Sequence, residues 1–370
     1  MDRGLRGQLR KTKFYVDLMR RRARGGGISF GRQAVEIAYL WSRNGVGPFY
    51  YFRAGLDGRE ITWREKLEHV DGKPYLKMVR RINPAEYNFV VMNKIVTHGV
   101  LRSFAIPTPS FYGVINGPRG QTFDGKPLCT SGDLEALVDR VGVDEMCFKL
   151  LGGWSGKGFM RVRFEERQDT VVVVGEPDGR RMALDDFWNT GLAGGQGRAY
   201  VCQGVIRQLE NVAAFHPWSV NTARVWMYQP ERGCWEMFDA LLRMGVNQSC
   251  VDNTSAGGIT ARIDRASGKL DAAVDRKPDR TVYSHHPTTG AQIEGTVLPM
   301  WEEAQRLCER ACRAFPYFRF LALDVAFGWD GPLVIEVECE PGAGHQAVFG
   351  HGVKGLLASL AQRGPFGWRG

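Results

Sequence analysis

The spacing of apolar residues predicts a helical beginning for this chain. Apolar residues recur at helical intervals among arginines and lysines as far as Met19, which predicts a basic amphipathic helix ended by the glycines at 25–27. Further helices are expected over 33–44 and over 83–101, the latter with Asn83 as its N-cap. This part of the chain is therefore expected to be mainly helical.

After about residue 131 the pattern changes to short apolar runs separated by turns. A capped helix beginning at Ser131 precedes these runs, and another helix is expected over 301–314. Apolar runs of this length, bounded by glycine and polar residues, are typical of strands. The expected strands are 145–151, 159–164, 169–175, 199–206, 222–228, 234–242, 258–264, 318–327 and 332–339. Strands with a few interspersed helices predict an α+β fold.

The charge is concentrated at the N-terminus. The net charge of +9 comes from 49 Lys and Arg against 40 Asp and Glu, and residues 1–32 hold ten basic and two acidic residues, which leaves +1 for the rest. A basic segment is typical of nucleic-acid or membrane-surface binding. We prefer a solvated helix that packs on the body or on a partner subunit. No nucleic acid is expected as a partner, and a homo-oligomer is left open.

Composition excludes several other classes of protein. The apolar fraction of 44% and the charged fraction of 24% are those of a globular chain rather than a disordered or collagen-like one. No stretch approaches the roughly 20 apolar residues of a membrane-spanning helix, and no apolar segment typical of a secretory signal follows the basic residues. The eight cysteines are scattered without zinc spacing, so we expect free thiols in a reducing, cytoplasmic setting.

Three acidic residues near the C-terminus are the strongest chemical signal. Two apolar segments joined by a short turn should pair as antiparallel strands, and side chains two apart share a face, so Glu336 and Glu338 point the same way. A five-residue loop, 328–332, would put Asp324 opposite Glu336. Carboxylates this close favour a cation, and Mg²⁺ prefers such oxygen ligands. The alternatives are a solvated edge hairpin and, less favoured, the acid–base pair of a glycosidase.

A glycine-rich loop follows the strand that ends near Lys149. Residues 152–158 contain four glycines and Lys157, a composition that lets backbone amides and a cation approach a phosphate. The spacing is not that of a Walker loop, because Gly158 stands where Ser or Thr is required and the flanks are strands. A flexible hairpin closing over phosphates fits better, and a turn with incidental lysines is the alternative.

Taken in order, these features resemble the ATP-grasp superfamily over residues 83–345. The fragments that resemble it are 83–114, 148–159, 201–210, 216–225, 252–258 and 323–346. Asn221–Val225 and His286–Gly290 look most like the sugar-transfer-associated ATP-grasp subgroup, and the chain is also similar to the ligases that add glutamate to ribosomal proteins. Ala322 stands where D-alanine–D-alanine ligases carry an arginine.

The resemblance implies an α+β ATP-grasp fold, in which two α+β subdomains grip ATP after a helical or α–β N-terminal region. The expected division is a basic helix at 1–32, an N-terminal domain at 33–127, a central subdomain with the glycine flap at 128–202, and a C-terminal subdomain with the magnesium site at 203–370.

The resemblance also assigns roles for the cofactors, ATP and Mg²⁺. Lys94 and Lys149 would reach the phosphates, and Glu210 would accept from the ribose. Asp324, Glu336 and Glu338 would hold Mg²⁺, with Glu338 in place of the family's usual Asn. The flap residues expected to bind ATP are Gly152, Gly153, Ser155, Gly156 and Lys157, and the hinge residues are Gln203, Gly204, Val205 and Ile206.

The implied reaction joins a carboxylate to an amine through an acyl phosphate, releasing ADP and phosphate. Arg224, Arg243 and Lys157 are the expected catalytic residues. The substrates would be small molecules of the amino-acid, peptide or sugar-acid type, and the alternative is a kinase of the same fold acting on a hydroxyl. The expected substrate residues are Asn221, Arg224, Arg243, Asn253, Gly257 and Gly258, and the histidines considered as bases are His216, His285, His286 and His345.

Overall fold

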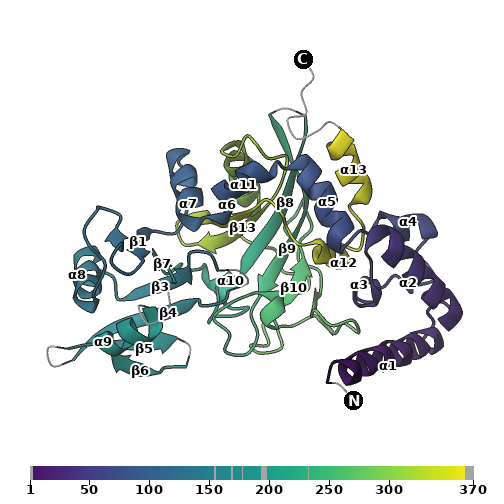
Figure 1. Cartoon of the computed structure of the whole chain (residues 1–370), viewed down its shortest axis with the longest axis horizontal. Helices are drawn as coiled ribbons and strands as arrows, with labels where there is room; N and C mark the ends of the chain where they lie inside the picture. The colour runs from purple at the N-terminus through teal and green to yellow at the C-terminus, as the bar shows by residue number, and fades with distance from the viewer. Residues whose placement is uncertain are drawn as a thin grey trace.

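The molecule consists of a helical N-terminal part and two seven-stranded antiparallel sheets (Figure 1). This computed structural model describes residues 3–153, 156–167, 170–176, 178–192, 198–231 and 233–362, and all statements below concern those residues. The larger second sheet lies in the middle, with the first sheet on one side of it and the N-terminal helices on the other.

The N-terminal helices pack around a small core of their own. Leu18, Leu40, Tyr51 and Phe52 are fully buried in it. Among the described helices, none has both the length and the apolar character that crossing a membrane requires. The helices of this core are α1 (Arg3–Arg24), α2 (Phe30–Asn44), α3 (Pro48–Arg53) and α4 (Trp63–Glu68), and the next helix, α5 (Gly72–Ile82), packs on the second sheet.

The single helix expected over 83–101 is interrupted. The chain forms η1 (Ala85–Tyr87), α6 (Asn88–Met92) and α7 (Lys94–Ser103). Asn93 causes the break, because its side chain accepts from the backbone of Ile95 at 3.0 Å and caps α7. Asn83 is therefore not the cap that we expected. Its buried amide instead donates to the carbonyls of Phe320 and Cys339 at 2.6 and 2.7 Å.

The first sheet has the strand order β2-β1-β7-β3-β4-β5-β6. Its first two strands lie within the stretch expected to form the N-terminal domain, and β1 pairs directly with β7. Buried residues of α8, including Leu134 and Leu137, pack on Phe148 and Cys202 of the sheet. The elements of this unit are β1 (Phe111–Ile115), β2 (Gln121–Thr122), α8 (Ser131–Val141), β3 (Glu145–Leu150), β4 (Met160–Arg167), β5 (Thr170–Glu176), β6 (Arg181–Ala183), α9 (Leu184–Phe187), η2 (Trp188–Leu192) and β7 (Tyr200–Gly204).

The second sheet has the order β12-β11-β10-β9-β8-β13-β14 and forms the largest core. Its strands are β8 (Thr222–Glu231), β9 (Cys234–Met244), β10 (Ile259–Arg262), β11 (Ala273–Val274), β12 (Val282–Tyr283), β13 (Phe320–Gly328) and β14 (Gly331–Glu338). The other elements of this part are α10 (Glu210–Ala213), η3 (Thr254–Ala256), α11 (Trp301–Arg313), η4 (Ala343–His345), α12 (Gln346–Phe349) and α13 (Lys354–Gln362).

Helices cover both faces of this sheet. Along β13, Leu321 and Leu323 belong to the core under α11, whereas Phe320 and Ala322 belong to the core with α5 and α13. The alternation follows from the two-residue period of a strand. Asp324 lies two residues after Ala322 and therefore on the same face of β13 as Phe320 and Ala322. On that face its carboxylate lies beyond the part covered by α5 and α13.

The hairpin of β13 and β14 has a shorter turn than we expected. Only two residues, 329 and 330, separate the paired Gly328 and Gly331, rather than the five-residue loop of the sequence analysis. Asp324 nevertheless pairs with Glu336, because the register shifts between Asp324 and Val325. The extra residue of this β-bulge compensates for the shorter turn, and the three carboxylates still share a face.

Candidate active site

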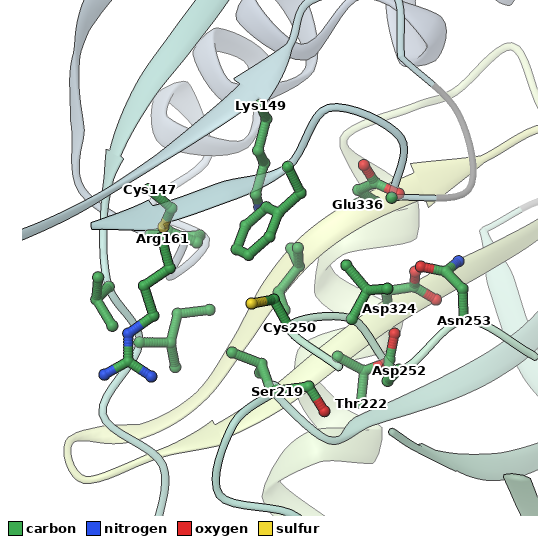
Figure 2. Close-up of a pocket in the computed structure, with 18 of the residues that line it drawn as sticks. Cys147, Lys149, Arg161, Ser219, Thr222, Cys250, Asp252, Asn253, Asp324 and Glu336 are labelled. Carbon is green, nitrogen blue, oxygen red and sulfur yellow. The ribbon is translucent and has the colours of Figure 1, made fainter. Parts of the chain in front are cut away.

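A cavity of about 440 Å³ lies between the two sheets (Figure 2). One wall comes from β3 and β4 and from the segment after β7, and the other wall comes from β8, β9, β13 and β14. Segments that are far apart in the sequence therefore meet here. The predicted residues that line it are Lys94, Lys149, Gly153, Gly156, Lys157, Gly204, Val205, Ile206, Arg224, Arg243, Asn253, Asp324, Glu336 and Glu338.

The three carboxylates of the hairpin converge on this cavity. Asp324, Glu336 and Glu338 each offer an oxygen, and these oxygens lie within 4.8 Å of one another. Asp324 is buried, whereas the side chain of Glu336 is 38% exposed. The geometry brings together the three residues that the sequence predicted as one group.

Arg224 binds two of these acids at once. Its Nε and Nη2 donate to both oxygens of Asp324 at 2.7 and 2.8 Å, and its Nη2 and Nη1 donate to Glu338 at 2.7 and 3.0 Å. The fork geometry of a guanidinium makes such paired bonds strong. Most N–H groups of Arg224 therefore donate to the acids. The sequence, by contrast, led us to expect that Arg224 contacts the substrate.

Arg243 contacts the same cluster from the next strand. Its Nη2 donates to Asp324 and to the Thr222 hydroxyl, both at 2.7 Å, and its Nε lies 3.3 Å from Asp252. Among the described residues no hydrogen bond engages Nη1 of Arg243, so two of its N–H groups remain for another partner.

Opposite charges set the protonation of the acids. Burial alone would raise the pKa of Asp324, but Arg224 and Arg243 outweigh it and hold this pKa well below its usual range. Burial raises the pKa of Glu338. Arg224 opposes that increase, and the negative charges of Asp324 and Glu336 add to it. A cation placed beside Glu338 would therefore relieve repulsion that the arginine leaves uncompensated.

Lys94 connects this cluster to the glycine loop. It is the first residue of α7, and its Nζ donates to the carbonyl of Gly153 at 3.0 Å and lies 3.5 Å from Glu336. Lys149, on β3, lines the cavity from the other sheet (Figure 2). Lys94 thus lies beside the acids, and Lys149 lies on the wall of the cavity formed by the first sheet.

The glycine loop rests against the segment around Asn253. Gly156 has a φ of +72°, and a Cβ there would meet Val251 at 2.8 Å and the side chain of Asn253 at 2.9 Å. A side chain at Gly156 would therefore be strained as well as crowded. Gly152 does not line the cavity, and Ser155 lies outside the described residues.

The structure separates some predicted residues from the cavity. Glu210 begins α10, is exposed and does not line the cavity, so its geometry gives no support to the ribose role. Asn221 is fully buried and donates to the carbonyls of Val212 and His216, which stabilises the local backbone. Gln203 and Gly257 line neighbouring cavities, and Gly258 packs against backbone atoms of the strand end.

The candidate histidines have structural partners or lie elsewhere. His216 bonds Ser219 and Asn247, and His286 bonds the carbonyl of Gly245 at 2.8 Å. Burial lowers the pKa of both. His285 contacts Ser284, and the ring of His345 lies 4.6 Å from that of Trp226. The four histidines do not line the cavity between the sheets.

Sequence reasoning did not assign a role to two residues that complete the cluster. Asp252 is buried beside Arg243, and it accepts a hydrogen bond from Thr222. Burial raises the pKa of Asp252, while Arg243 opposes that increase. Asp252 precedes Asn253 in a fragment used for the family resemblance, and its position there was the available signal.

The donor set fits a hard divalent cation. All three candidate ligands are carboxylates, which Mg²⁺ favours, and Glu336 is held only loosely, by the contact with Lys94. The eight cysteines are free thiols, and a soft-metal site is not among the groups that the described residues form.

The two sheets with this cavity between them define the protein as an ATP-grasp enzyme. Residues 76–362 match the sugar-transfer associated ATP-grasp family, and the chain belongs to that family. A search of curated proteins finds no significant match.

Several solved structures of low sequence identity are similar to this chain. They include the ATP-grasp ligase PsnB complexed with minimal precursor, with 12% identity over 76% of this chain and 63% of that one and a TM-score of 0.38. The D-cycloserine synthetase DcsG has 14% identity over 85% and 93%, with a TM-score of 0.43. D-alanine–D-alanine ligase from Bacillus anthracis has 13% identity over 74% and 66%, with a TM-score of 0.40. The chain thus spans less than two thirds of the length of the first and third of these proteins.

Proposed function

We propose that the protein is an ATP-dependent carboxylate–amine ligase. The observation that carries this proposal is the single cavity that Lys94 and Lys149 line together with three clustered carboxylates, Asp324, Glu336 and Glu338. Phosphoryl transfer from ATP requires cationic side chains that bind the phosphates and carboxylates that bind the metal ion, and this cavity is lined by both.

The end of the cavity near β7 suits the nucleotide base and the phosphates. The chain leaves the sheet after Gly204, the last residue of β7, and we propose that the backbone of Val205 and Ile206, which line the cavity, pairs with the base edge. Lys149 lies nearby on β3, and Lys157 and the glycines of the loop come from the turn that joins β3 to β4. These residues would bind ATP, orient its phosphates and exclude water from them.

The hairpin acids would hold Mg²⁺. Glu336, the most exposed of the three, is the candidate for direct binding, with Glu338 beside it and Asp324 held in place by the two arginines. Bound Mg²⁺ would neutralise charge on the phosphates. Arg224 then acts as a positioning residue, because its contacts orient Asp324 and Glu338.

Arg243 is the better candidate for contact with the substrate carboxylate. It lines the cavity, and its Nη1 has no hydrogen bond among the described residues, whereas Arg224 is largely occupied. A guanidinium binds a carboxylate by a planar pair of N–H groups. Asn253, between Arg243 and the glycine loop, is placed to contact the same substrate.

The chemistry follows from these positions. A carboxylate oxygen attacks the terminal phosphorus of ATP, ADP leaves, and the resulting acyl phosphate is open to an amine. The amine nitrogen bonds to the carbonyl carbon, phosphate leaves, and the amine loses a proton. Lys157 and Arg243 would stabilise negative charge that develops during these steps. The substrates we propose are of the amino-acid, peptide or sugar-acid type.

The test is an ADP-release screen of carboxylates crossed with amines in the presence of ATP and Mg²⁺. A ligase requires both partners for full turnover and releases free phosphate. Phosphate retained on a hydroxylated product would instead identify a kinase and overturn the ligase proposal. Glu336→Gln serves as the inactive control for each positive pair.

A further inference from the structure

Helix α2 presents an outward face that carries almost no charge. Trp41 and Val35 are 67% and 69% exposed, and Tyr39 is 42% exposed. The exposed charged residues of the helix, Arg32 and Arg43, lie at the border of this face. The exposed uncharged positions are Phe30, Gly31, Ala34, Val35, Ala38, Tyr39, Trp41 and Ser42, and we call them the α2 face.

Neighbouring aromatic residues extend the α2 face. Trp63, at the start of α4, packs against Tyr39 with ring centroids 5.3 Å apart and is itself 38% exposed. Single exposed apolar residues are ordinary on protein surfaces, but several large ones gathered on one helix and its neighbour mark an interaction site.

Helix α1, which packs on α2 through its C-terminal half, adds positive charge to this part of the molecule. Leu18 and Met19 anchor the C-terminal half of α1 in the core shared with α2, whereas residues 7–14 are exposed throughout. Leu9 and Phe14 are among the exposed residues. The basic residues of α1 that have no acidic partner among the described residues are Arg10, Lys11, Lys13 and Arg24.

We infer that α1 and the α2 face together form a surface that docks on an anionic lipid membrane. Tryptophan and tyrosine are favoured at the boundary between lipid headgroups and acyl chains. Helices with apolar residues on one face and Lys or Arg on another lie in that boundary. A cluster of basic residues next to such a helix binds the negative surface of the bilayer.

The charge disfavours a second copy of this chain as the occupant. Residues 1–32 carry ten basic and two acidic residues, so two copies pressed together at the α2 face would bring two strongly positive segments close. RNA would satisfy the charge of α1 but would leave Val35 and Trp41 without an apolar partner. A membrane satisfies both the charge and the apolar side chains.

The test is co-sedimentation of the full chain with vesicles. We expect binding to phosphatidylcholine vesicles that contain phosphatidylglycerol, and about tenfold weaker binding to phosphatidylcholine alone. The double variant Tyr39→Ser/Trp41→Ser should lose about tenfold in binding to the anionic vesicles, and Lys11→Glu/Lys13→Glu should lose a similar amount.

Phe123→Ser is the matched control, because Phe123 is also exposed but belongs to the first sheet's unit, far from α2 in Figure 1. It should bind as the wild type does. Thermal unfolding of each variant establishes that the fold is retained. The inference is overturned if the wild type does not sediment with anionic vesicles or if the Tyr39/Trp41 variant binds them unchanged. A dimer in light scattering that this variant dissociates would overturn it as well.

Discussion

At the scale of single residues, the site depends on buried charges that balance one another. Arg224 and Arg243 surround Asp324 and favour its ionised form, and each arginine also contacts a second acid, Glu338 or Asp252. Glu336 differs from Asp324, since it is partly exposed to the cavity, and the one ion pair it forms with a described residue is with Lys94 at 3.5 Å. Residues with these two environments should respond differently to substitution.

Glu336→Gln should abolish turnover without unfolding the protein. The change removes a charge from the proposed Mg²⁺ ligands, and we expect kcat to fall by about 10²-fold or more. Steady-state ADP release measures this effect. Glu340→Gln is the matched control, because Glu340 binds Arg80 at the surface rather than the cavity. Wild-type activity of Glu336→Gln would contradict the site assignment.

Arg224→Met should unfold more easily than the wild type. Removing the arginine leaves Asp324 buried and without its main partner, and such losses cost about 3–5 kcal/mol. Denaturant unfolding gives the change in free energy. The double variant Arg224→Met/Asp324→Leu should recover part of the loss, since it removes the orphaned charge as well. A double variant less stable than the single one would refute this account.

At the scale of elements, alternation predicts the strands, and single side chains decide where elements end. The pleat of β13 and β14 was sufficient to predict that three acids share a face. The break at Asn93 was not evident, because a capping asparagine within an apolar helical pattern competes with continued helix. The bulge in β14, where Ile335 is the extra residue, was also hidden, since turn length and bulge compensate each other and leave no separate trace in the apolar pattern.

Gly156→Ala should impair the glycine loop. The positive φ and the closeness of Val251 leave no room for a methyl group, so we expect the loop to shift and KM for ATP to rise about tenfold. Gly152→Ala is the matched control, because a Cβ there meets nothing within 4 Å. Equal KM values for the two variants would show that the loop does not hold the nucleotide.

His69, which follows α4, should make stability depend on pH. Burial lowers its pKa to about 4, and its Nδ1 contacts the Tyr50 hydroxyl at 2.9 Å. The unfolded chain takes up a proton near pH 6.5 and the folded chain does not. Stability is therefore complete above pH 6.5 and falls by about 3 kcal/mol as the pH drops toward 4.

Urea unfolding across this pH range measures the effect. His69→Gln should flatten this part of the profile, whereas His285→Gln, at an exposed position, should leave it unchanged. A profile for His69→Gln that is as steep as that of the wild type would assign the dependence to other groups.

At the scale of the whole molecule, the sequence was informative about the residues that line the cavity. It was less informative about the residues that only stabilise the surrounding structure. The acids and the three lysines that line the cavity were predictable, because their residue types stand out against apolar or glycine-rich surroundings. The positions of Asn221 and Glu210 give no support to their expected roles, since a buried structural amide and an exposed acid look the same in one dimension as ligand contacts. Only the tertiary packing separates these cases.

The two contacts of Lys94 have a consequence for the order of events in a catalytic cycle. One ammonium group holds the carbonyl of Gly153 in the glycine loop and lies beside Glu336 in the hairpin of the other sheet. Because Lys94 belongs to α7, movement of the loop would break its hydrogen bond to Gly153 and leave the ammonium group beside Glu336. A cation bound at Glu336 would repel this ammonium group and so weaken its hold on the loop. Opening of the glycine loop and exchange of the proposed metal ion should therefore be coupled.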